Sequence, residues 1–270
     1  MLSAFSNFSG LGAVSRRTLP QRIRSLFTAG EQGVWYDPSD FSTMFQDSAG
    51  TTPVTAVEQP VGKILDKSGR GNHATQATSS KRPTLKQDGN GKYYLKFDGV
   101  DDALVTGSID FTAGDKMTVF AGVRKLSDAS EGELLSLSVD PPTSIGVFSL
   151  ASPGGSGTEA FSFRSRGTSS AFATIPVATF PAPTTKVIAA IGNISGDIST
   201  LRVNSAQVAT SSTNQGTGNY GNYPLYIGAR AGTLLPFNGH LYGLIVRGAQ
   251  STDAQIVSAE TYVNSKTGAY

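Results

Sequence analysis

The chain of 270 residues carries 22 basic and 20 acidic residues, and its formal net charge of +2 gives its body no nucleic-acid-binding character. It contains no cysteine, so disulfide bonds and thiolate chemistry are excluded, and folding in a reducing cytoplasm is favoured. No apolar run approaches the roughly 20 residues that a membrane-spanning helix needs. With 31 glycines and 16% charged residues, the composition suits short strands joined by tight turns, in one large β domain or two small ones.

The first 30 residues form a basic segment. They contain four arginines and no acidic residue, whereas the rest of the chain contains 18 basic and 20 acidic residues. Within this segment, Pro20 to Phe27 predicts a short helix with Ile23, Leu26 and Phe27 on one face. We interpret residues 1–30 as an attachment arm that pairs with acidic groups of a partner through Arg16, Arg17, Arg22 and Arg24. A solvated tail is the alternative.

The segment from Asp66 to Leu104 holds the most distinctive pattern. It opens with the polar loop DKSGRGNH and later enters Tyr93–Phe97, whose β-favouring aromatic residues predict a strand. Asp98-Gly99 follows as a tight-turn pair that supplies the positive φ needed for a reversal. The return strand is expected to start at Val100.

This order of loop, aromatic strand and FDGVDD turn resembles the laminin-G-like branch of the concanavalin A-like jelly rolls. The string from Gly33 to Gln76, which begins GVWYDPSDF, resembles the opening of a family of tailed-bacteriophage structural proteins that carry such a domain. The resemblance implies a virion component, either a head or tail fibre or a decoration protein, made in the host cytoplasm. It also implies other virion proteins as partners and assembly as a homo-oligomer.

The remaining chain predicts the strands of a sandwich. Turn signals separate short apolar stretches at intervals of about 8–12 residues. The expected strands are Met117–Arg124, Leu134–Val139, Ile145–Leu150, Ala160–Arg164, Lys186–Gly192, Leu225–Gly228 and Gly239–Arg247. A hairpin is expected around Asn204-Ser205. The segment from Ile175 to Thr185 contains three prolines, which predicts an edge strand or a long loop.

The chain ends in a predicted helix. Thr252 and Gln255 form a capping box, and Gly268 follows as the stop signal. The fold prediction is therefore an all-β, concanavalin A-like or laminin-G-like jelly-roll sandwich over residues 31–270, with an extended N-terminal arm and a short C-terminal helix.

No pattern indicates an enzyme. Jelly-roll glycoside hydrolases place carboxylates on one strand as E-x-D-x-E, a string that this chain lacks. Glu131 and Glu133 share a strand face beside a turn, and we interpret them as solvated charges. His73 and His240 are far apart in the sequence and are interpreted as structural residues. A polysaccharide-degrading enzyme is the less favoured alternative, because it would need two carboxylates about 5–10 Å apart in a cleft.

The loop GTGNYGNYP, residues 216–224, is the candidate carbohydrate site. It formally matches G-x-G-x-x-G, but it opens no helix of a βαβ unit, so a nucleotide site is rejected. Tyrosine faces can stack on sugar rings, and asparagine amides offer both donors and acceptors to hydroxyls. The candidate residues are Asn219, Tyr220, Asn222 and Tyr223. The alternative is a plain connecting loop.

A weak metal candidate lies at Asp98, Asp101 and Asp102, since hard oxygen ligands suit Ca²⁺. Three carboxylates fall short of the six to eight oxygens that Ca²⁺ takes, so no cofactor is expected. Trp35, the only tryptophan, is expected in the core.

Together these patterns predict a non-enzymatic phage virion protein. Its arm would attach it to the particle, and its lectin-like domain would bind host surface glycan through many weak contacts. A purely structural fibre or decoration protein without a ligand is the alternative. Neither a membrane span nor a nucleic-acid partner is expected.

Overall fold

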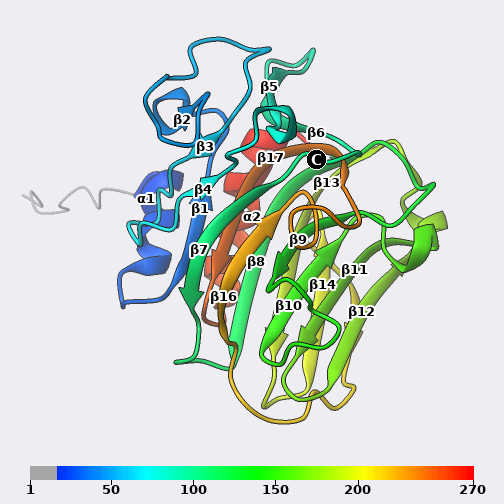
Figure 1. The fold of residues 1–270 in the computed structure, drawn as a ribbon. Coiled ribbons are helices and arrows are strands. Elements are labelled where there is room, and N and C mark those ends of the chain that lie inside the picture. Colours follow the sequence, from blue (N-terminus) through cyan, green and yellow to red (C-terminus); the bar gives the residue numbers. More distant parts are fainter. Residues whose placement is uncertain (1–16) are drawn as a thin grey trace, which may run out of the picture.

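The computed structural model in Figure 1 describes residues 17–270, and residues 1–16, with Arg16, lie outside the described part. Two antiparallel β sheets pack face to face, and a short helix follows the last strand. The predicted all-β sandwich with a C-terminal helix is confirmed.

The eight-stranded sheet has the order β15-β14-β13-β8-β17-β6-β5, and β1 pairs with β17 outside this path. Its strands are β1 (Gly33–Tyr36), β5 (Thr84–Gln87), β6 (Tyr93–Asp98), β8 (Lys116–Lys125), β13 (Thr184–Asn193), β14 (Ile198–Val203), β15 (Ala206–Ser211) and β17 (Asn238–Arg247). The long central strands β8, β13 and β17 have largely apolar sequences because both of their faces are covered.

The nine-stranded sheet has the order β12-β11-β10-β9-β16-β7-β4-β3-β2. Its strands are β2 (Met44–Phe45), β3 (Lys63–Ile64), β4 (Ala74–Thr75), β7 (Leu104–Asp110), β9 (Glu133–Leu137), β10 (Val147–Ala151), β11 (Glu159–Arg166), β12 (Ser170–Pro176) and β16 (Asn222–Ile227). Its inner face contributes residues such as Phe148, Phe161 and Phe163 to the main core between the sheets. In Figure 1 its outer face is turned toward the viewer.

Local turn chemistry accounts for several connections. Gly99 has φ +77 after β6, as the Asp98-Gly99 signal predicts. Asn204 and Ser205 have φ +48 and +67 between β14 and β15, the left-handed values that a two-residue hairpin turn needs. The prediction of an edge strand or a loop for the proline-rich segment 175–185 is confirmed. The outermost strand β12 ends at Pro176, and residues 177–183 connect it to β13.

A helical layer covers the outer face of the eight-stranded sheet. It consists of α1 (Leu19–Arg24), the 3₁₀ turn η1 (Ser25–Phe27) and α2 (Asp253–Thr267). Further 3₁₀ turns are η2 (Phe41–Thr43), η3 (Ser79–Lys81), η4 (Gly155–Gly157) and η5 (Val177–Thr179). A second core forms between this layer and the sheet, with Trp35 and Phe120 at its centre. The expectation that Trp35 is a core residue is confirmed, since it is 2% exposed.

The helix predicted near residue 20 is confirmed, and it belongs to the folded body. It starts at Leu19, with a capping box between Thr18 and Gln21. Ile23, Leu26 and Phe27 are all buried in the second core. Residues 19–27 therefore pack on the sandwich, and the domain boundary at residue 30 stays a prediction.

Helix α2 is capped as the sequence predicts. Thr252 and Gln255 form the capping box, and Gly268 takes the left-handed conformation after the last turn. The helix lies so close to β8 that a Cβ atom added at Gly122 would be 2.0 Å from Thr267 Oγ1. Within residues 17–270, no helix has both the length and the apolar character to cross a membrane.

Candidate functional site

A straight row of side chains crosses the outer face of the nine-stranded sheet. The strand registers place one residue from each of five neighbouring strands directly opposite the next. From β16 to β12 these residues are Tyr226, Ser136, Ser149, Arg164 and Phe172. Because neighbouring strands lie about 4.8 Å apart, the row spans about 19 Å.

Several polar atoms in and beside this row are buried without a hydrogen-bond partner among the described residues. They are Glu133 Oε1, Ser136 Oγ, Arg164 Nε and Arg166 Nε. Buried polar atoms are nearly always hydrogen-bonded, and leaving one unpaired costs about 1–3 kcal/mol. Their concentration on one face marks polar groups whose hydrogen bonding within the described residues is incomplete.

Glu133 is the most unusual of these residues. It begins β9 opposite Ala151, and it is 4% exposed. Burial raises the pKa of Glu133 to about 7, although the Ser149 hydroxyl and nearby arginines oppose the shift. The interpretation of Glu133 as a solvated charge is therefore wrong, because the strand directs it onto a covered part of the sheet face.

Arg164 and Phe172 form the end of the row at β11 and β12. The Arg164 guanidinium lies 4.7 Å from the centre of the Phe172 ring, within cation–π range. Burial lowers the pKa of Arg164, and the Glu133 carboxylate opposes this effect. Phe172 remains 43% exposed, so an aromatic ring and a guanidinium are presented together at the surface.

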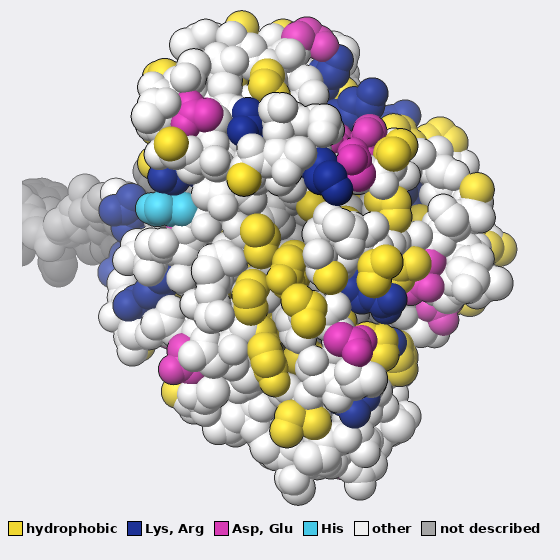
Figure 2. Space-filling model, in the orientation of Figure 1, with side chains coloured by type: hydrophobic (Ala, Val, Ile, Leu, Met, Phe, Trp, Pro, Cys, Tyr) yellow, Lys and Arg dark blue, Asp and Glu magenta, His cyan; other side chains and the backbone are white. Residues whose placement is uncertain are grey.

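Figure 2 shows the surface of this face. Hydrophobic side chains gather over the middle of the sheet, and Lys or Arg side chains lie beside Asp or Glu side chains on the side of β10, β11 and β12. Exposed apolar residues come from the flanking loops, where Val139 and Ile145 follow β9 and Leu234 follows β16. The face thus combines apolar surface with charged and hydroxyl groups.

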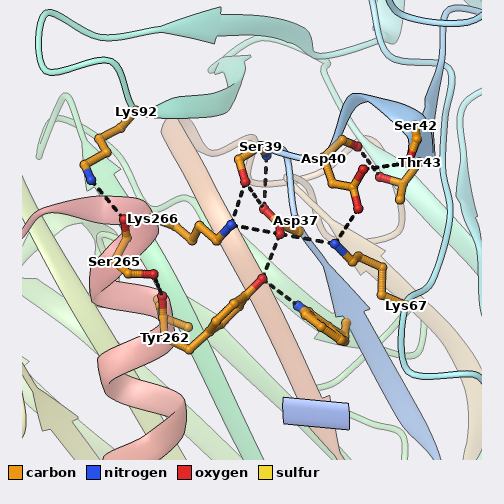
Figure 3. Close-up of polar contacts among 12 residues, drawn as sticks. Asp37, Ser39, Asp40, Ser42, Thr43, Lys67, Lys92, Tyr262, Ser265 and Lys266 are labelled. Carbon is orange, nitrogen blue, oxygen red and sulfur yellow. Dashed lines mark hydrogen bonds and ion pairs between the residues drawn. The ribbon is translucent and has the colours of Figure 1, made fainter. Parts of the chain in front are cut away.

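A dense polar cluster lies elsewhere, around Asp37 (Figure 3). Asp37 Oδ1 accepts hydrogen bonds from the backbone and side chain of Ser39, at 3.1 and 2.6 Å. Asp37 Oδ2 accepts from Tyr262 at 2.7 Å and forms ion pairs with Lys67 and Lys266, at 3.3 and 3.0 Å. Burial alone would raise the pKa of Asp37, but these hydrogen bonds and the two lysines lower it to about 2.

This cluster is fully bonded internally. The Tyr262 hydroxyl also accepts a hydrogen bond from Trp35 Nε1, and Lys67 reaches Asp40 Oδ2 at 2.5 Å. Lys266 Nζ donates to Ser39 Oγ at 2.7 Å. Each oxygen of the carboxylate thus has a partner, so the cluster joins α2 to the segment after β1 and offers no free group to a ligand.

The candidate carbohydrate loop is only partly at the surface. Tyr220 is 1% exposed, packs edge-on against Phe148 and hydrogen-bonds to Ser165 Oγ at 2.6 Å. It cannot stack on a sugar, because both ring faces lie in the protein, and this part of the prediction is wrong. Asn219 and Asn222 are exposed, although the Asn219 amide donates to the Thr112 carbonyl.

Tyr223, the last residue of that candidate set, is half-buried. Its ring packs against the main core, and its hydroxyl donates to the Ile145 carbonyl at 3.3 Å. Asn219, Asn222 and Tyr223 remain candidates, but the structure places them at one end of β16, outside the five-residue row.

The three aspartates of the metal candidate do come together, with ligand oxygens within 4.8 Å of one another. Asp98 Oδ1 accepts hydrogen bonds from the backbone of residues 100, 101 and 102, and Asp102 Oδ2 accepts from the Asp98 backbone at 3.0 Å. Burial and the Asp98 charge raise the pKa of Asp102 to about 7. Two of the three carboxylates thus stabilise the turn itself.

The described arginines of the attachment candidate lie on or beside α1, and all three are exposed. Arg22 donates to the Arg17 carbonyl at 3.2 Å and contacts Ser258 of α2. Arg17 and Arg24 line a shallow depression of about 470 Å³ together with Gln21, Ser25 and Thr28.

Sequence reasoning missed the row on the nine-stranded sheet. A signal was present in β11, where FSFRSR alternates phenylalanines with Ser162, Arg164 and Arg166. That alternation predicts one polar face, but not which residues of other strands share it.

Neither a protein-family model nor a curated protein sequence matches the chain. Solved structures do match its fold. A botulinum neurotoxin type C structure, described as showing cell entry dependent on two ganglioside molecules, has a TM-score of 0.57 at 7% identity. The match covers 86% of this chain and 51% of the neurotoxin chain. The botulinum neurotoxin DC binding domain in complex with SialylT has a TM-score of 0.54 at 10% identity, and the match covers 74% of this chain and 48% of that chain.

A Trypanosoma rangeli sialidase also matches, with a TM-score of 0.55 at 13% identity, over 88% of this chain and 33% of its own. The chain thus spans about half or less of these proteins. At such identities the likeness establishes the fold alone: the chain is a β-sandwich of the kind found in toxin binding domains.

Proposed function

We propose that the chain is a non-catalytic glycan-binding module that holds a saccharide along the outer face of its nine-stranded sheet. The observation that carries the proposal is the row from Tyr226 to Phe172, with buried and unpaired polar atoms of Glu133, Ser136 and Arg164 in or beside it. Sugar hydroxyls both donate and accept hydrogen bonds, so they can complete carboxyl, hydroxyl and guanidinium groups alike.

The two ends of the row are aromatic. Phe172 is 43% exposed and Tyr226 is half-buried, so each can offer a ring to the apolar face of a sugar. The row's length of about 19 Å suits an oligosaccharide better than a single sugar. The neurotoxin structures described with SialylT and with ganglioside molecules support a glycan ligand for this fold.

A glycosidase is the competing function, and Glu133 favours it. A carboxyl with a pKa of about 7 can act as a general acid at neutral pH. Hydrolysis would also need a second carboxylate about 5–10 Å away. Glu131 is close enough to raise the pKa of Glu133, but its Oε2 accepts a hydrogen bond from the Ser156 backbone.

The test is a glycan array probed with the wild-type chain and with Phe172→Ala, Arg164→Gln and Val208→Ala. Val208 is a matched control, because it is 41% exposed but lies on β15 of the other sheet. We expect the first two variants to bind the recognised glycans at least about tenfold more weakly and the control to bind normally. Equal binding by all four chains, or no binding by the wild type, would contradict the proposal.

The same glycans separate binding from hydrolysis. The wild type and Glu133→Gln are incubated with each recognised glycan, and release of reducing ends is followed. A non-catalytic module releases none. Release by the wild type that disappears in Glu133→Gln would establish the glycosidase instead.

We also propose that this module is part of a virion and that its N-terminal segment attaches it there. The support is the resemblance of Gly33–Gln76 to phage structural proteins and the exposed Arg17, Arg22 and Arg24 around α1. Many copies on one particle would turn weak glycan contacts into firm adhesion.

Light scattering after size-exclusion chromatography tests the attachment role. Full-length chain is compared with a chain that begins at Arg17, which retains the buried Ile23, Leu26 and Phe27. We expect an oligomer from the full-length chain and a folded monomer from the shorter one. An oligomer in both cases would show that the sandwich itself forms the interface.

A further inference from the structure

A second row of side chains lies on the opposite sheet, on the part of its outer face that carries polar residues. His240 of β17 pairs directly with Lys96 of β6 on one side and with Arg124 of β8 on the other. Strand spacing puts the backbones of Lys96 and Arg124 about 10 Å apart, with the histidine between them. Two long cationic side chains therefore flank one imidazole.

The imidazole of His240 is held in a fixed orientation. Its ring stacks on Tyr94, with centroids 3.9 Å apart and an interplanar angle of 17°. Tyr242 contacts the same pair, 5.2 Å from the Tyr94 ring. His240 Nδ1 is buried and has no hydrogen-bond partner among the described residues.

The two flanking cations are not neutralised. Neither Lys96 nor Arg124 forms an ion pair within residues 17–270, and Arg124 reaches only the Thr185 hydroxyl, at 3.4 Å. Lys86, the next cation on this face, is paired with Glu58. Lys96 on β6 and Arg124 on β8 are like charges on either side of β17, so their mutual repulsion gives the free protein no stability.

We propose that Lys96, His240 and Arg124 form a binding site for a tetrahedral oxyanion, the phosphate or sulfate group of a small molecule. A planar guanidinium can bind two oxygens of such a group, an ammonium adds a point charge, and an imidazole N–H donates a further hydrogen bond. An anion between the two cations replaces their repulsion with attraction. This site lies on the other sheet from the glycan row, so it does not depend on the function proposed above.

Anion binding at this site is coupled to pH. Burial, Arg124 and Lys96 lower the pKa of His240 to about 4, and Asp88 partly opposes them. The charged and titratable groups that face His240 are Lys96 and Tyr94 of β6, Lys86 of β5, Arg124 of β8, Tyr242 of β17 and Asp88 before β6. A bound anion stabilises the protonated imidazole, so it raises this pKa, and affinity increases as the pH falls.

The chain's two histidines make this directly observable by NMR of the imidazole signals. His73 is the internal control, because its Nδ1 accepts a hydrogen bond from the Asp66 backbone. We expect inorganic sulfate or phosphate to shift the His240 signals saturably and to raise the midpoint of their pH titration. Sodium chloride at equal ionic strength should leave them in place, and His73 should not respond to any of the three salts.

Variants assign the effect to the row. Lys96→Gln and Arg124→Gln should each weaken sulfate binding about tenfold, whereas Lys86→Gln should bind normally. Lys96 is exposed, so its replacement tests the site even where loss of Arg124 disturbs folding. The proposal is overturned if the His240 signal does not move in sulfate or moves equally in chloride. It is also overturned if Lys86→Gln weakens sulfate binding as much as Lys96→Gln does.

A sulfated hexose and the same unsulfated hexose identify the source of the group. If the sulfated sugar binds at least about tenfold more tightly than inorganic sulfate, the site recognises an ester group on a saccharide. If the two bind equally, it recognises the free anion. If the unsulfated sugar shifts His240 as strongly as the sulfated one, the oxyanion assignment is wrong.

Discussion

The Tyr262 hydroxyl of α2 donates a hydrogen bond of 2.7 Å to Asp37 Oδ2, across 225 residues of sequence. The same carboxylate is paired with Lys67, in the polar loop that follows β3, and with Lys266, in the last turn of α2. One buried aspartate thus joins three distant segments around Trp35 (Figure 3). This arrangement explains why the C-terminal helix is fixed on the sheet.

Replacing Asp37 by asparagine should lower the free energy of unfolding by about 2–4 kcal/mol, because it leaves two lysines without their shared partner. Tyr262→Phe removes only the hydroxyl and should cost about 1–2 kcal/mol. Urea unfolding measures both effects. Asp253→Asn, at the exposed start of α2, is the control and should change stability by less than about 0.5 kcal/mol.

The contribution of Asp37 has a defined pH dependence. Since its folded-state pKa is about 2, below its ordinary value of 3.8, the stabilisation is complete above pH 4 and disappears as the pH falls toward 2. The difference in stability between wild type and Asp37→Asn should therefore shrink on acidification across this range. A difference that stays constant from pH 6 to about pH 2 would contradict the assignment.

The pH dependence of stability that Glu133 causes should be opposite to that of Asp37. Its folded-state pKa of about 7 exceeds the ordinary value of 4.5, so ionisation opposes folding as the pH rises through this window. Glu133→Gln should match the wild type near pH 4 and exceed it by about 1–3 kcal/mol above pH 7. Asp102 titrates in the same window, so the difference between the two chains is the quantity to measure. Parallel stability curves would contradict the raised pKa of Glu133.

Tyr220→Phe separates packing from glycan recognition. Loss of the hydroxyl breaks the hydrogen bond with Ser165, and Ser165 keeps its bond to Gln215. We expect a loss of about 0.5–1.5 kcal/mol in the free energy of unfolding and unchanged glycan binding. If the fully folded Tyr220→Phe chain binds glycan more weakly than the wild type, Tyr220 is a glycan contact after all.

The aspartate turn gives a prediction about calcium. Asp98 and Asp102 already accept backbone hydrogen bonds, and the three carboxylates supply too few ligands for Ca²⁺. We expect the same melting temperature in calcium and in EDTA. Asp101 is more exposed than Asp102, so it is the residue to replace. A calcium-dependent increase in melting temperature that disappears in Asp101→Asn would instead establish a metal site.

Local sequence patterns determined the parts of the fold that depend on neighbouring residues. The turn at Asn204-Ser205 and the capping box at Thr252 follow from residue types a few positions apart. The buried face of α1 also follows from its spacing of apolar residues. Each feature requires no knowledge of how distant strands pair.

The candidate site depends on long-range pairing, which is why the sequence did not reveal it. Ser136 and Phe172 are brought into one row only by the registers of three intervening strand pairs. Glu133 resembles a surface charge until β9 is placed beside β10. Tyr220 can equally be a loop aromatic or a core residue, and its contact with Phe148 decides between them.

The most direct test of glycan binding on the nine-stranded sheet is NMR of the arginine Nε–Hε signals during titration with the best-bound oligosaccharide of the array. Arg164 Nε has no partner among the described residues, so a bound sugar should shift the Arg164 signal saturably. The Arg124 signal, on the opposite sheet, should stay in place for an uncharged sugar. If Arg164 is unmoved at saturation while other residues respond, the ligand binds elsewhere and the central claim fails.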